Sequence, residues 1–243
     1  MQADLGTATI GILAKFWQPG RVKTRLGASI GMDRAAELHR VFVTHLLHQL
    51  LNVRSRRVLC VDPPDCSQVI HDALVQQKLE RHWQITAQTA GPLGTRMQNW
   101  FREELSRENT SCAVLIGGDC PTIGPEEIRN AVETLEKNDA VVIPADDGGY
   151  VLLGMRGPWR AGHGGHEALF DQIAWSTNQV LQQTYERARQ ADLRIAELPA
   201  MADVDTEADL QELRSRLRQL DASVLRDNID AVMTESLTPE RDP

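Results

Sequence analysis

Short apolar runs alternate with amphipathic stretches as far as residue 143. The run Thr7–Ala14 is mostly apolar and stops at a basic loop with proline and glycine, which is typical of a buried parallel strand. From Asp33 to Leu51 apolar residues recur at three- and four-residue steps, which predicts an amphipathic helix with Asp33 as a possible N-cap. Strands are predicted at 7–14, 57–61, 83–87, 113–116 and 140–143, and helices at 33–51, 67–79, 94–105 and 125–136. This alternation predicts βαβ units and a mainly parallel sheet, with ligands bound at the carboxyl ends of the strands.

The pattern becomes less regular beyond Tyr150. Strands are predicted at 151–155 and 193–198, and helices at 177–190 and 206–220. A stretch rich in glycine and histidine lies at 157–165, and no internal repeat interrupts the chain. We therefore expect one α/β domain over residues 1–220, with 221–243 as a tail or an accessory helix.

Composition and charge narrow the class of ligand. The chain has 243 residues, of which 42% are hydrophobic and 25% charged, as in an ordinary folded protein. Its formal net charge is −8 and its pI is near 5.4, so we expect neither polymeric nucleic acid nor an anionic membrane surface as a partner. Four cations nevertheless gather in one short segment, namely Lys15, Arg21, Lys23 and Arg25. That local excess suits a small anion such as a phosphate.

Cysteine usage and the lack of leader-like or membrane-like segments favour a cytoplasmic location. Cys60, Cys66, Cys112 and Cys120 show neither C-x-x-C spacing nor zinc-site spacing with histidines, so we expect reduced thiols. Residues 1–9 show no basic start before an apolar run, and no later stretch reaches the ~20 apolar residues of a membrane helix. The oligomeric state stays open.

The most basic segment, Lys15 to Leu26 (KFWQPGRVKTRL), directly follows the first predicted strand. Glycine permits a close backbone approach, the amides of such a loop can hold phosphate oxygens, and cationic side chains neutralise them. The segment matches neither a Walker A loop nor G-x-G-x-x-G, and a solvated surface loop is the alternative. The predicted phosphate-binding residues are Lys15, Gly20, Arg21, Lys23, Thr24 and Arg25.

The segment LIGGDCP places Asp119 at the end of another predicted strand. Mg²⁺ and Mn²⁺ take oxygen ligands, so an aspartate at a strand end can bind either ion together with phosphate oxygens. The two glycines before Asp119 leave room for a ligand. The alternative is that Asp119 only caps the turn before the helix predicted at Pro125.

A second candidate metal ligand lies in the segment 203–206 (DVDT), ahead of the last predicted helix. Two carboxylates from distant strand ends, Asp119 and Asp205, could hold one divalent ion over a pyrophosphate, with Asp203 as the rival to Asp205. Helix capping by Asp205 or Thr206 is the alternative.

Two further strand ends carry weaker candidates. In GPLGTR, the backbone at Gly91 and Gly94 could lie against a nucleobase or ribose, although a plain loop fits equally well. In PADDGGY, an Asp-Gly turn of a hairpin is the alternative to a binding role. The candidate residues there are Asp147, Gly148, Gly149 and Tyr150.

Six ordered blocks of the sequence resemble a bacterial glycosyltransferase-A-like family of unknown function, the radical-SAM/selenium-associated transferase family 1. The blocks are AKFWQPGRVKTRLG, GPLGTRM, LIGGDCPTI, PADDGGYVLLG, LFDQIAWSTNQVL and DVDTEADL, within residues 10–211. More distantly, the chain is similar to the molybdenum-cofactor and phospholactate guanylyltransferases. The resemblance implies a three-layer, Rossmann-like nucleotide-diphospho-sugar transferase (GT-A) fold with a mainly parallel mixed sheet.

The resemblance also implies roles by position. The basic loop corresponds to the family's nucleotide-phosphate loop, Asp119 to its metal-binding aspartate, and Asp205 to the second metal ligand. Gly91 and Gly94 correspond to the nucleobase-facing turn, and residues 147–150 to the acceptor side.

The chain departs from the family pattern in three places. Trp17 stands where proline is more frequent, and Cys120 where a serine is usual. The first change leaves the basic residues untouched. Added residues around 157–165 put the identity of the acceptor in doubt.

Two reactions share this architecture, and both need a metal-bridged pyrophosphate. In nucleotidyl transfer, a small phosphorylated acceptor attacks the α-phosphorus of a nucleoside triphosphate. The expected catalytic residues are Lys23, Arg25 and Asp119, and the expected cofactor is Mg²⁺ or Mn²⁺. In glycosyl transfer, a nucleotide-diphospho-sugar is the donor. The cationic first loop favours the triphosphate, and a non-catalytic nucleotide-binding module is the remaining alternative.

Overall fold

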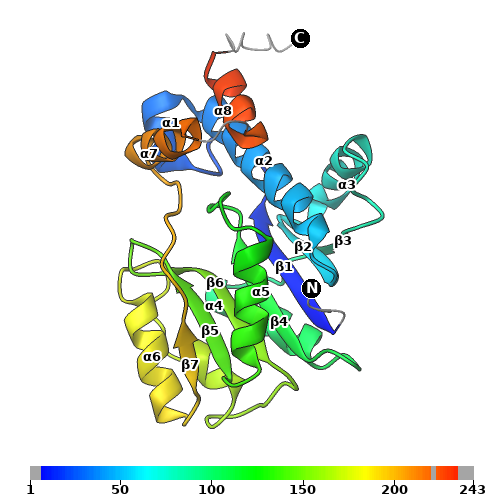
Figure 1. Ribbon diagram of the computed structural model, residues 1–243, viewed down its shortest axis with the longest axis vertical. Helices are drawn as coiled ribbons and strands as arrows, with labels where there is room; N and C mark the ends of the chain where they lie inside the picture. Colours follow the sequence, from blue (N-terminus) through cyan, green and yellow to red (C-terminus); the bar gives the residue numbers. More distant parts are fainter. Residues whose placement is uncertain (1–6, 220–222, 235–243) are drawn as a thin grey trace.

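A seven-stranded mixed sheet forms the centre of the computed structural model, which describes residues 7–219 and 223–234. The strands lie in the order β3-β2-β1-β4-β6-β5-β7 (Figure 1). They are β1 (Ala8–Lys15), β2 (Arg56–Asp62), β3 (Gln84–Ala87), β4 (Cys112–Gly117), β5 (Ala140–Pro144), β6 (Tyr150–Arg156) and β7 (Ile195–Glu197). Neighbouring strands are parallel except where β6 pairs with β4 and β5. The predicted α/β fold with a mainly parallel mixed sheet is confirmed.

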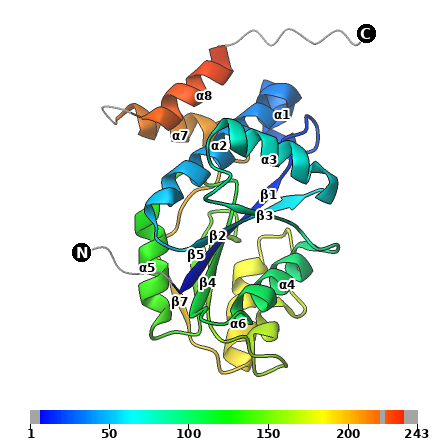
Figure 2. The same ribbon diagram turned by 90° about the vertical axis from the view of Figure 1, so that its right-hand side faces the viewer.

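Helices cover both faces of the sheet and make three layers (Figure 2). The helices are α1 (Thr24–Ile30), α2 (Met32–Gln49), α3 (Ser67–Gln76), α4 (Leu93–Leu105), α5 (Pro125–Leu135), α6 (Val180–Gln190), α7 (Glu207–Arg218) and α8 (Val224–Thr234), with short 3-10 turns at 50–52, 64–66 and 166–170. Side chains of α2, α3 and α5 pack on one face, and those of α4 and α6 on the other. Alternate residues of β1 point to opposite faces of the sheet. Ile10 and Ile12 pack on the face covered by α2, α3 and α5, whereas Gly11 leaves room for the Trp100 indole on the other face.

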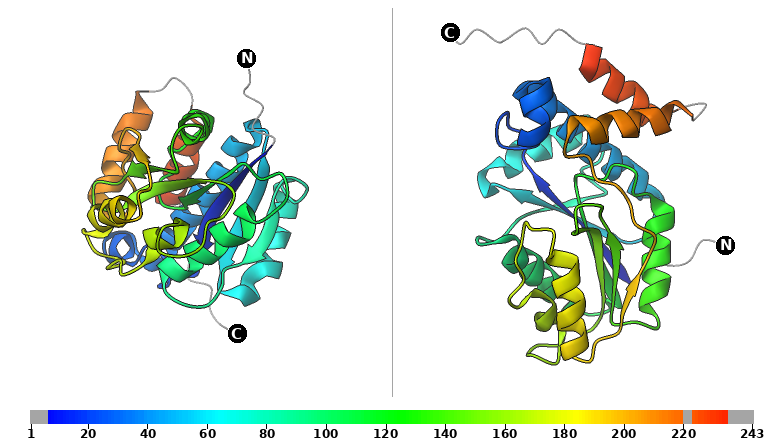
Figure 3. Two further views of the ribbon diagram at one scale, coloured as in Figure 1. Left: turned by 90° about the horizontal axis from the view of Figure 1, so that it is seen from below. Right: turned by 90° about the vertical axis from the view of Figure 1, so that its left-hand side faces the viewer.

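A third apolar cluster joins α1, α2, α7 and α8 at one end of the molecule (Figures 1 and 3). Leu26, Phe42, Leu210 and Ile229, one from each helix, are fully buried in it. Burial of each such side chain stabilises the fold by roughly 1.5–3 kcal/mol. Because α1 follows the basic loop and α7 follows segment 203–206, this packing holds the two segments in a fixed relation.

Local periodicity located most elements within a few residues of their observed bounds, but α1 was missed. It begins at Thr24, inside the segment predicted as a loop. Of the range predicted as a tail or accessory helix, 224–234 forms α8, and 221, 222 and 235–243 lie outside the described residues. The last predicted helix corresponds to α7, and its predicted final residue, Leu220, also lies outside them, as do residues 1–6.

The stretch 157–165 lies at the edge of the sheet opposite the carboxyl ends of the parallel strands. β6 runs antiparallel to β4, so its last residue, Arg156, pairs with Cys112, the first residue of β4. The Gly157 N–H continues this contact by donating to the Ser111 carbonyl (2.7 Å). None of residues 157–165 lines the cavity described below. The added residues therefore lie away from the cavity.

Asp139, just before β5, holds this distal edge together. Its carboxylate is 8% exposed and accepts hydrogen bonds from the Arg156 guanidinium (3.1 Å), the Arg160 guanidinium (2.9 Å) and the Arg194 backbone N–H (2.9 Å). Burial opposes ionisation, but the Arg194 N–H and the two guanidinium groups outweigh it and hold the pKa of Asp139 below its usual value. This network pairs a buried, ionised carboxylate with partly exposed arginines, away from the cavity.

Asp139→Asn should lower the free energy of unfolding by about 2 kcal/mol at pH 7, because it leaves the guanidinium groups without their counter-ion. A depressed pKa stabilises the fold above the unfolded-state pKa and ceases to do so as pH falls through the folded-state value. The loss should therefore shrink below about pH 4. Urea unfolding at several pH values measures it, with the exposed Asp72→Asn as control. A loss of equal size at pH 7 and pH 3 would contradict the prediction.

Candidate active site

A cavity of about 910 Å³ opens at the carboxyl ends of β1, β4 and β5. The predicted site residues that line it are Lys15, Arg21, Lys23, Thr24, Arg25, Asp119, Asp147, Gly149, Tyr150 and Asp205. Asp203, the rival metal ligand, lines it too. The other predicted residues, Gly20, Gly91, Gly94 and Gly148, are not among its lining residues. Parallel strands thus bring together candidates that are up to 190 positions apart in the sequence, from Lys15 to Asp205.

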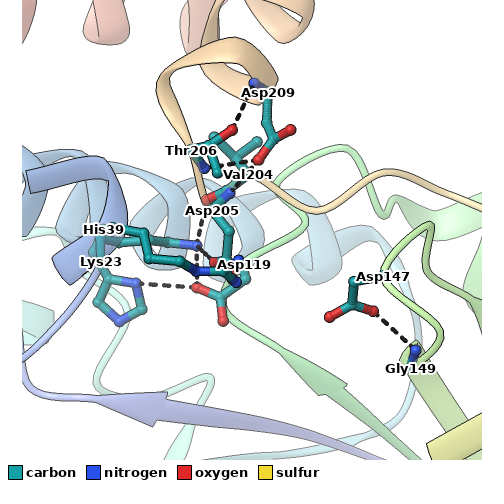
Figure 4. Close-up of polar contacts among 10 residues, drawn as sticks. Lys23, His39, Asp119, Asp147, Gly149, Val204, Asp205, Thr206 and Asp209 are labelled. Atoms are coloured by element: carbon teal, nitrogen blue, oxygen red, sulfur yellow. Dashed lines mark hydrogen bonds and ion pairs between the residues drawn. The ribbon is translucent and has the colours of Figure 1, made fainter. Parts of the chain in front are cut away.

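The Lys23 ammonium lies at the centre of the polar contacts (Figure 4). Lys23 is the N-cap of α1 with a left-handed backbone (φ 47°), and its side chain is 2% exposed. Nζ donates to the Val204 carbonyl (2.6 Å) and to Asp205 Oδ1 (3.2 Å), and it pairs with Asp119 Oδ1. An ammonium has three protons, so these acceptors use all of them. In this arrangement none is left for a phosphate, and Lys23 acts as the shared counter-ion of the two candidate metal ligands.

Asp119 follows β4 and reaches the cavity with a half-exposed side chain (49%). Its carbonyl accepts a hydrogen bond from the Val204 N–H (3.0 Å), which ties the end of β4 to segment 203–206. The N-cap of α5 is Gly124, so capping of that helix does not explain Asp119. Burial opposes its ionisation, but Lys23, and after it His39, outweigh burial and lower the pKa of Asp119. Asp119 is thus an ionised carboxylate in the cavity.

Thr206, rather than Asp205, caps α7. Its hydroxyl accepts a hydrogen bond from the Asp209 N–H (3.3 Å), and the Asp209 carboxylate accepts from the Thr206 N–H (2.7 Å), which makes a capping box. The carboxylate of Asp205 is therefore available to pair with cations. Its Oδ1 pairs with the Lys23 ammonium, and its Oδ2 pairs with the guanidinium of Arg25, whose side chain is 66% exposed. Capping and cation binding are therefore divided between neighbouring residues.

Asp203 forms no ion pair within the described part of the chain, and its surroundings are acidic. Burial, followed by the negative charges of Asp205 and Asp147, raises its pKa to about 6. Close to neutral pH this side of the cavity therefore has more carboxylates than cations to pair with them.

Two cations of the basic loop remain available for a ligand. Lys15, the last residue of β1, and Arg21 are both exposed, line the cavity and form no ion pair among residues 7–219 and 223–234. Gly20 has a positive φ of 75°, which glycine adopts without strain, and open space around it. The prediction of a phosphate loop therefore depends mainly on Lys15 and Arg21.

His39 of α2 is a site residue that sequence reasoning missed. Its side chain is 5% exposed, and Nε2 lies 3.1 Å from the Lys15 carbonyl, to which it must donate. Nδ1 faces Asp119 Oδ1 at 3.7 Å and makes no hydrogen bond to any residue that the structure describes. Burial, the largest effect, lowers the pKa of His39. The residue connects the start of the basic loop to Asp119, yet no motif in the sequence marked it as a site residue.

Gln88 and Arg96 form a second polar network that the sequence did not reveal. Gln88 is buried, and its Nε2 donates to the carbonyls of Ala14 (3.1 Å) and Cys60 (3.0 Å). Its Oε1 accepts from Arg96 Nη1 (3.0 Å), which also donates to Asp62 Oδ2 (3.2 Å). Gln88 thus links the ends of β1 and β2 and holds Arg96 at the cavity.

A wall of the cavity consists of Trp175, Ser176, Thr177 and Asn178, the segment before α6. The pattern predicted the helix from Thr177, whereas α6 begins at Val180. The Trp175 indole covers Gly94, where a Cβ atom would come within 2.2 Å of the ring. Gly94 therefore faces an indole of the same chain. The block LFDQIAWSTNQVL was the available signal for this wall.

Gly148 fixes this wall to the turn between β5 and β6. It has a φ of 86°, and a Cβ atom there would lie 2.3 Å from the Asn178 carbonyl oxygen. Gly148→Ala should therefore cost about 1 kcal/mol for backbone strain and about 1–2 kcal/mol more for displacing the wall. Gly162→Ala is a matched control, because Gly162 has a φ of 84° with no atom within 4 Å. Chemical unfolding of both variants measures the difference, and equal losses would contradict the contact.

Several other features bear on the earlier expectations. Within the described residues, no helix has both the length and the apolar composition needed to cross a bilayer. All four cysteines are free and buried, and burial raises the pKa of the Cys120 thiol.

The donor set suits a divalent cation only in part. Among the described residues, no three histidine, cysteine, aspartate or glutamate side chains gather as a metal site. Asp119 and Asp205, however, already converge on one cation, the Lys23 ammonium. Mg²⁺ is commonly bound by one or two carboxylates together with substrate phosphates and water. Two convergent carboxylates at an open cavity therefore fit such an ion when a phosphate ligand completes its shell.

Comparison with known families identifies the family of this chain. Residues 46–177 match the model of a family described as an uncharacterised protein conserved in bacteria (DUF2064), which is more than half of the chain. The chain belongs to the DUF2064 family. The matched range contains Asp119 and Asp147, whereas the basic loop and Asp205 lie outside it. No curated protein matches the sequence.

Solved structures extend the comparison to nearly the whole DUF2064 chain. A protein from Desulfovibrio desulfuricans G20, provisionally named a nucleotide-diphospho-sugar transferase, is 31% identical with a TM-score of 0.81, over 94% of this chain and 97% of that one. A 4-diphosphocytidyl-2C-methyl-D-erythritol synthase from Anaerococcus prevotii DSM 20548 is 12% identical, with a TM-score of 0.53 over 88% and 100%. A CMP:2-keto-3-deoxy-manno-octonic acid synthetase complexed with CTP is 13% identical, with a TM-score of 0.53 over 88% and 99%. The protein thus has the fold of nucleotidyl and nucleotide-sugar transferases.

Proposed function

We propose that this DUF2064 protein is a metal-dependent nucleotidyltransferase, which moves a nucleotide from a nucleoside triphosphate to a small acceptor. The observation that carries the proposal is the pairing of two unengaged cations, Lys15 and Arg21, with two convergent carboxylates, Asp119 and Asp205, in one cavity. A triphosphate suits such a site because cations and a carboxylate-bound metal can hold it from two sides. The fold shared with nucleotidyltransferases, one of them complexed with CTP, supports it. Membership of the radical-SAM/selenium-associated family and action in the cytoplasm belong to the same proposal.

In this reaction, an acceptor oxygen forms a bond to the α-phosphorus while the bond to the leaving pyrophosphate breaks, and a proton carried by that oxygen is released to solvent. Lys15, Arg21 and the exposed Arg25 neutralise the charge that develops on the phosphate oxygens. Lys23 is a positioning residue, because its protons are used by the two carboxylates and the Val204 carbonyl. We retain Gly91 as part of the proposed nucleobase turn and residues 147–150 as the proposed acceptor side, whereas Gly94 is covered by the Trp175 indole.

Asp119 and Asp205 would hold Mg²⁺ or Mn²⁺, with Asp203 next to them as an additional carboxylate. When bound, such an ion stabilises negative charge on the bridging phosphates. Oδ2 of Asp119 belongs to a half-exposed side chain and has no partner among residues 7–219 and 223–234, so it is available for this purpose. Asp205 reaches the same point because Thr206 has taken over the capping of α7.

Thermal unfolding with Mg²⁺ and each nucleoside triphosphate tests the proposal. At least one triphosphate should raise the Tm by several degrees, since a ligand that binds only the native state at 100 times its Kd adds about 2.7 kcal/mol. The double variant Lys15→Ala, Arg21→Ala should abolish the shift, while the exposed Lys137→Ala outside the cavity should keep it. Stabilisation by nucleotide-diphospho-sugars but by no triphosphate would favour glycosyl transfer instead. Binding without pyrophosphate release, across a panel of acceptors, would favour a non-catalytic module.

A further inference from the structure

The charges that line the cavity are segregated along the sequence. Every lysine and arginine among the lining residues comes from positions 15–96, namely Lys15, Arg21, Lys23, Arg25 and Arg96. Positions 115–205 contribute no cation to the lining, but four carboxylates, namely Asp119, Asp147, Asp203 and Asp205. Lys23 and Arg25 are paired with Asp119 and Asp205, whereas Lys15, Arg21, Asp147 and Asp203 form no ion pair among the described residues. We call the part of the cavity at Lys15 and Arg21 the cationic half. The part at Asp147 and Asp203, whose charges act on each other, is the anionic half.

The anionic half also presents uncharged hydrogen-bonding groups. Ser176 and Asn178 are exposed on the cavity wall, and neither side chain makes a hydrogen bond within the described part of the chain. The hydroxyl of Thr177 is engaged within the loop, where it donates to the Ala174 carbonyl (2.7 Å). Asp147 lies across the site from Asp119 (Figure 4). Its Oδ1 accepts a hydrogen bond from the Gly149 N–H (2.8 Å), and its Oδ2 has no partner among the residues that the structure describes.

This half is built before any ligand arrives. The Trp175 ring lies on Gly94 and stacks on Phe170, with ring centroids 6.4 Å apart. The Leu181 N–H donates to the Gly148 carbonyl (2.9 Å), which joins the start of α6 to the turn between β5 and β6. Preformed surfaces of this kind bind with little loss of conformational entropy.

From this arrangement we infer that the acceptor is an uncharged polyhydroxyl compound of the sugar or polyol class, held by the Asp147 side of the cavity and the wall of Ser176 and Asn178. Hydroxyl groups donate to carboxylates and accept from amides, and this half offers both. A phosphate monoester placed there would face Asp147 and Asp203 without a cation from the same half, and close like charges repel strongly. The inference rests on the proposed function, which assigns the cationic half to the nucleotide. It replaces the small phosphorylated acceptor expected from the sequence.

Backbone-amide NMR of the full chain tests this inference with two matched probes, glucose and glucose 6-phosphate. Both are titrated in the presence of Mg²⁺ and a non-hydrolysable nucleoside triphosphate analogue, which occupies the cationic half. Glucose should shift the amides of Ser176, Thr177 and Asn178, with a Kd at least about tenfold lower than that of glucose 6-phosphate, equivalent to about 1.4 kcal/mol. The double variant Ser176→Ala, Asn178→Ala should lose the shifts and keep analogue binding.

Tighter binding of glucose 6-phosphate at these amides would overturn the inference, and so would the absence of shifts with either probe. Failure of the proposed function has a different signature. In that case the analogue itself causes no shifts at Lys15 and Arg21, whatever the two sugars do at the wall.

Discussion

Replacing Lys23 with methionine is expected to lower the free energy of unfolding by about 2–3 kcal/mol in metal-free buffer. The ammonium is 2% exposed and pairs with both Asp119 and Asp205, so its removal leaves two carboxylates close together without their common cation. Partial exposure of both carboxylates keeps the loss below that of a fully buried pair. Urea unfolding measures the change. Arg25→Met is the matched control, because the exposed Arg25 also pairs with Asp205 yet should cost less than about 1 kcal/mol.

The same variant also separates the two roles considered for Lys23. If the ammonium is the counter-ion of the metal ligands, saturating Mg²⁺ should raise the Tm of Lys23→Met more than that of the wild type, because the ion then becomes the main cation between the carboxylates. If the ammonium instead binds phosphate, the variant should lose nucleotide affinity as strongly as Arg21→Ala does and gain nothing from Mg²⁺. That second result would contradict the role proposed here.

Asp119→Asn should weaken Mg²⁺-dependent nucleotide binding at least about 100-fold, because even groups that only support a ligand commonly change metal affinity 10–100-fold. Asparagine keeps the shape and can still accept a hydrogen bond from Lys23, so the variant should fold. What it loses is the ionised oxygen that an Mg²⁺ ion prefers. Calorimetry with nucleotide, with and without Mg²⁺, gives the measurement.

Asp147→Asn provides the comparison for Asp119→Asn, since it removes a carboxylate from the same cavity outside the Lys23 contacts. It should keep Mg²⁺-dependent nucleotide binding within a few-fold of the wild type. If Asp119→Asn and Asp205→Asn both leave that binding unchanged, the catalytic proposal fails, and a nucleotide-binding module without a metal centre becomes the better account.

Much of the fold was predictable because it depends on local periodicity. Buried parallel strands read as short apolar runs, and amphipathic helices as three- and four-residue steps, so both can be recognised from one segment at a time. The predicted helix bounds were wrong where polar residues that line the cavity interrupt the hydrophobic pattern. α1 was missed because its start at Thr24 lies in a segment read as a cationic loop. The helix expected from Thr177 begins at Val180, because residues 175–178 form the cavity wall.

The candidate site divides in the same way. Position after a strand was enough to select Asp119 and the basic loop, because parallel strands bring their carboxyl ends to one edge. Which group each side chain meets depends on contacts between segments far apart in the sequence. Lys23 was predicted to bind phosphate, yet the packing of α1 against α7 places its ammonium 3.2 Å from Asp205, 182 positions away. His39 was missed for the same reason, because it lies on α2 whereas its neighbour Asp119 follows β4, far away in the sequence.

The residue types of this chain were thus sufficient to indicate a phosphate-handling α/β protein, because periodicity, glycine content and local charge are properties of short segments. Its distribution of charge in space became clear only with the packed structure. Lys15 and Arg21 stay available while Lys23 is paired with carboxylates, and Asp147 and Asp203 line the same cavity without an ion pair among the described residues. Both features arise because electrostatic interactions act through distances in space, and only the packing of the core sets those distances.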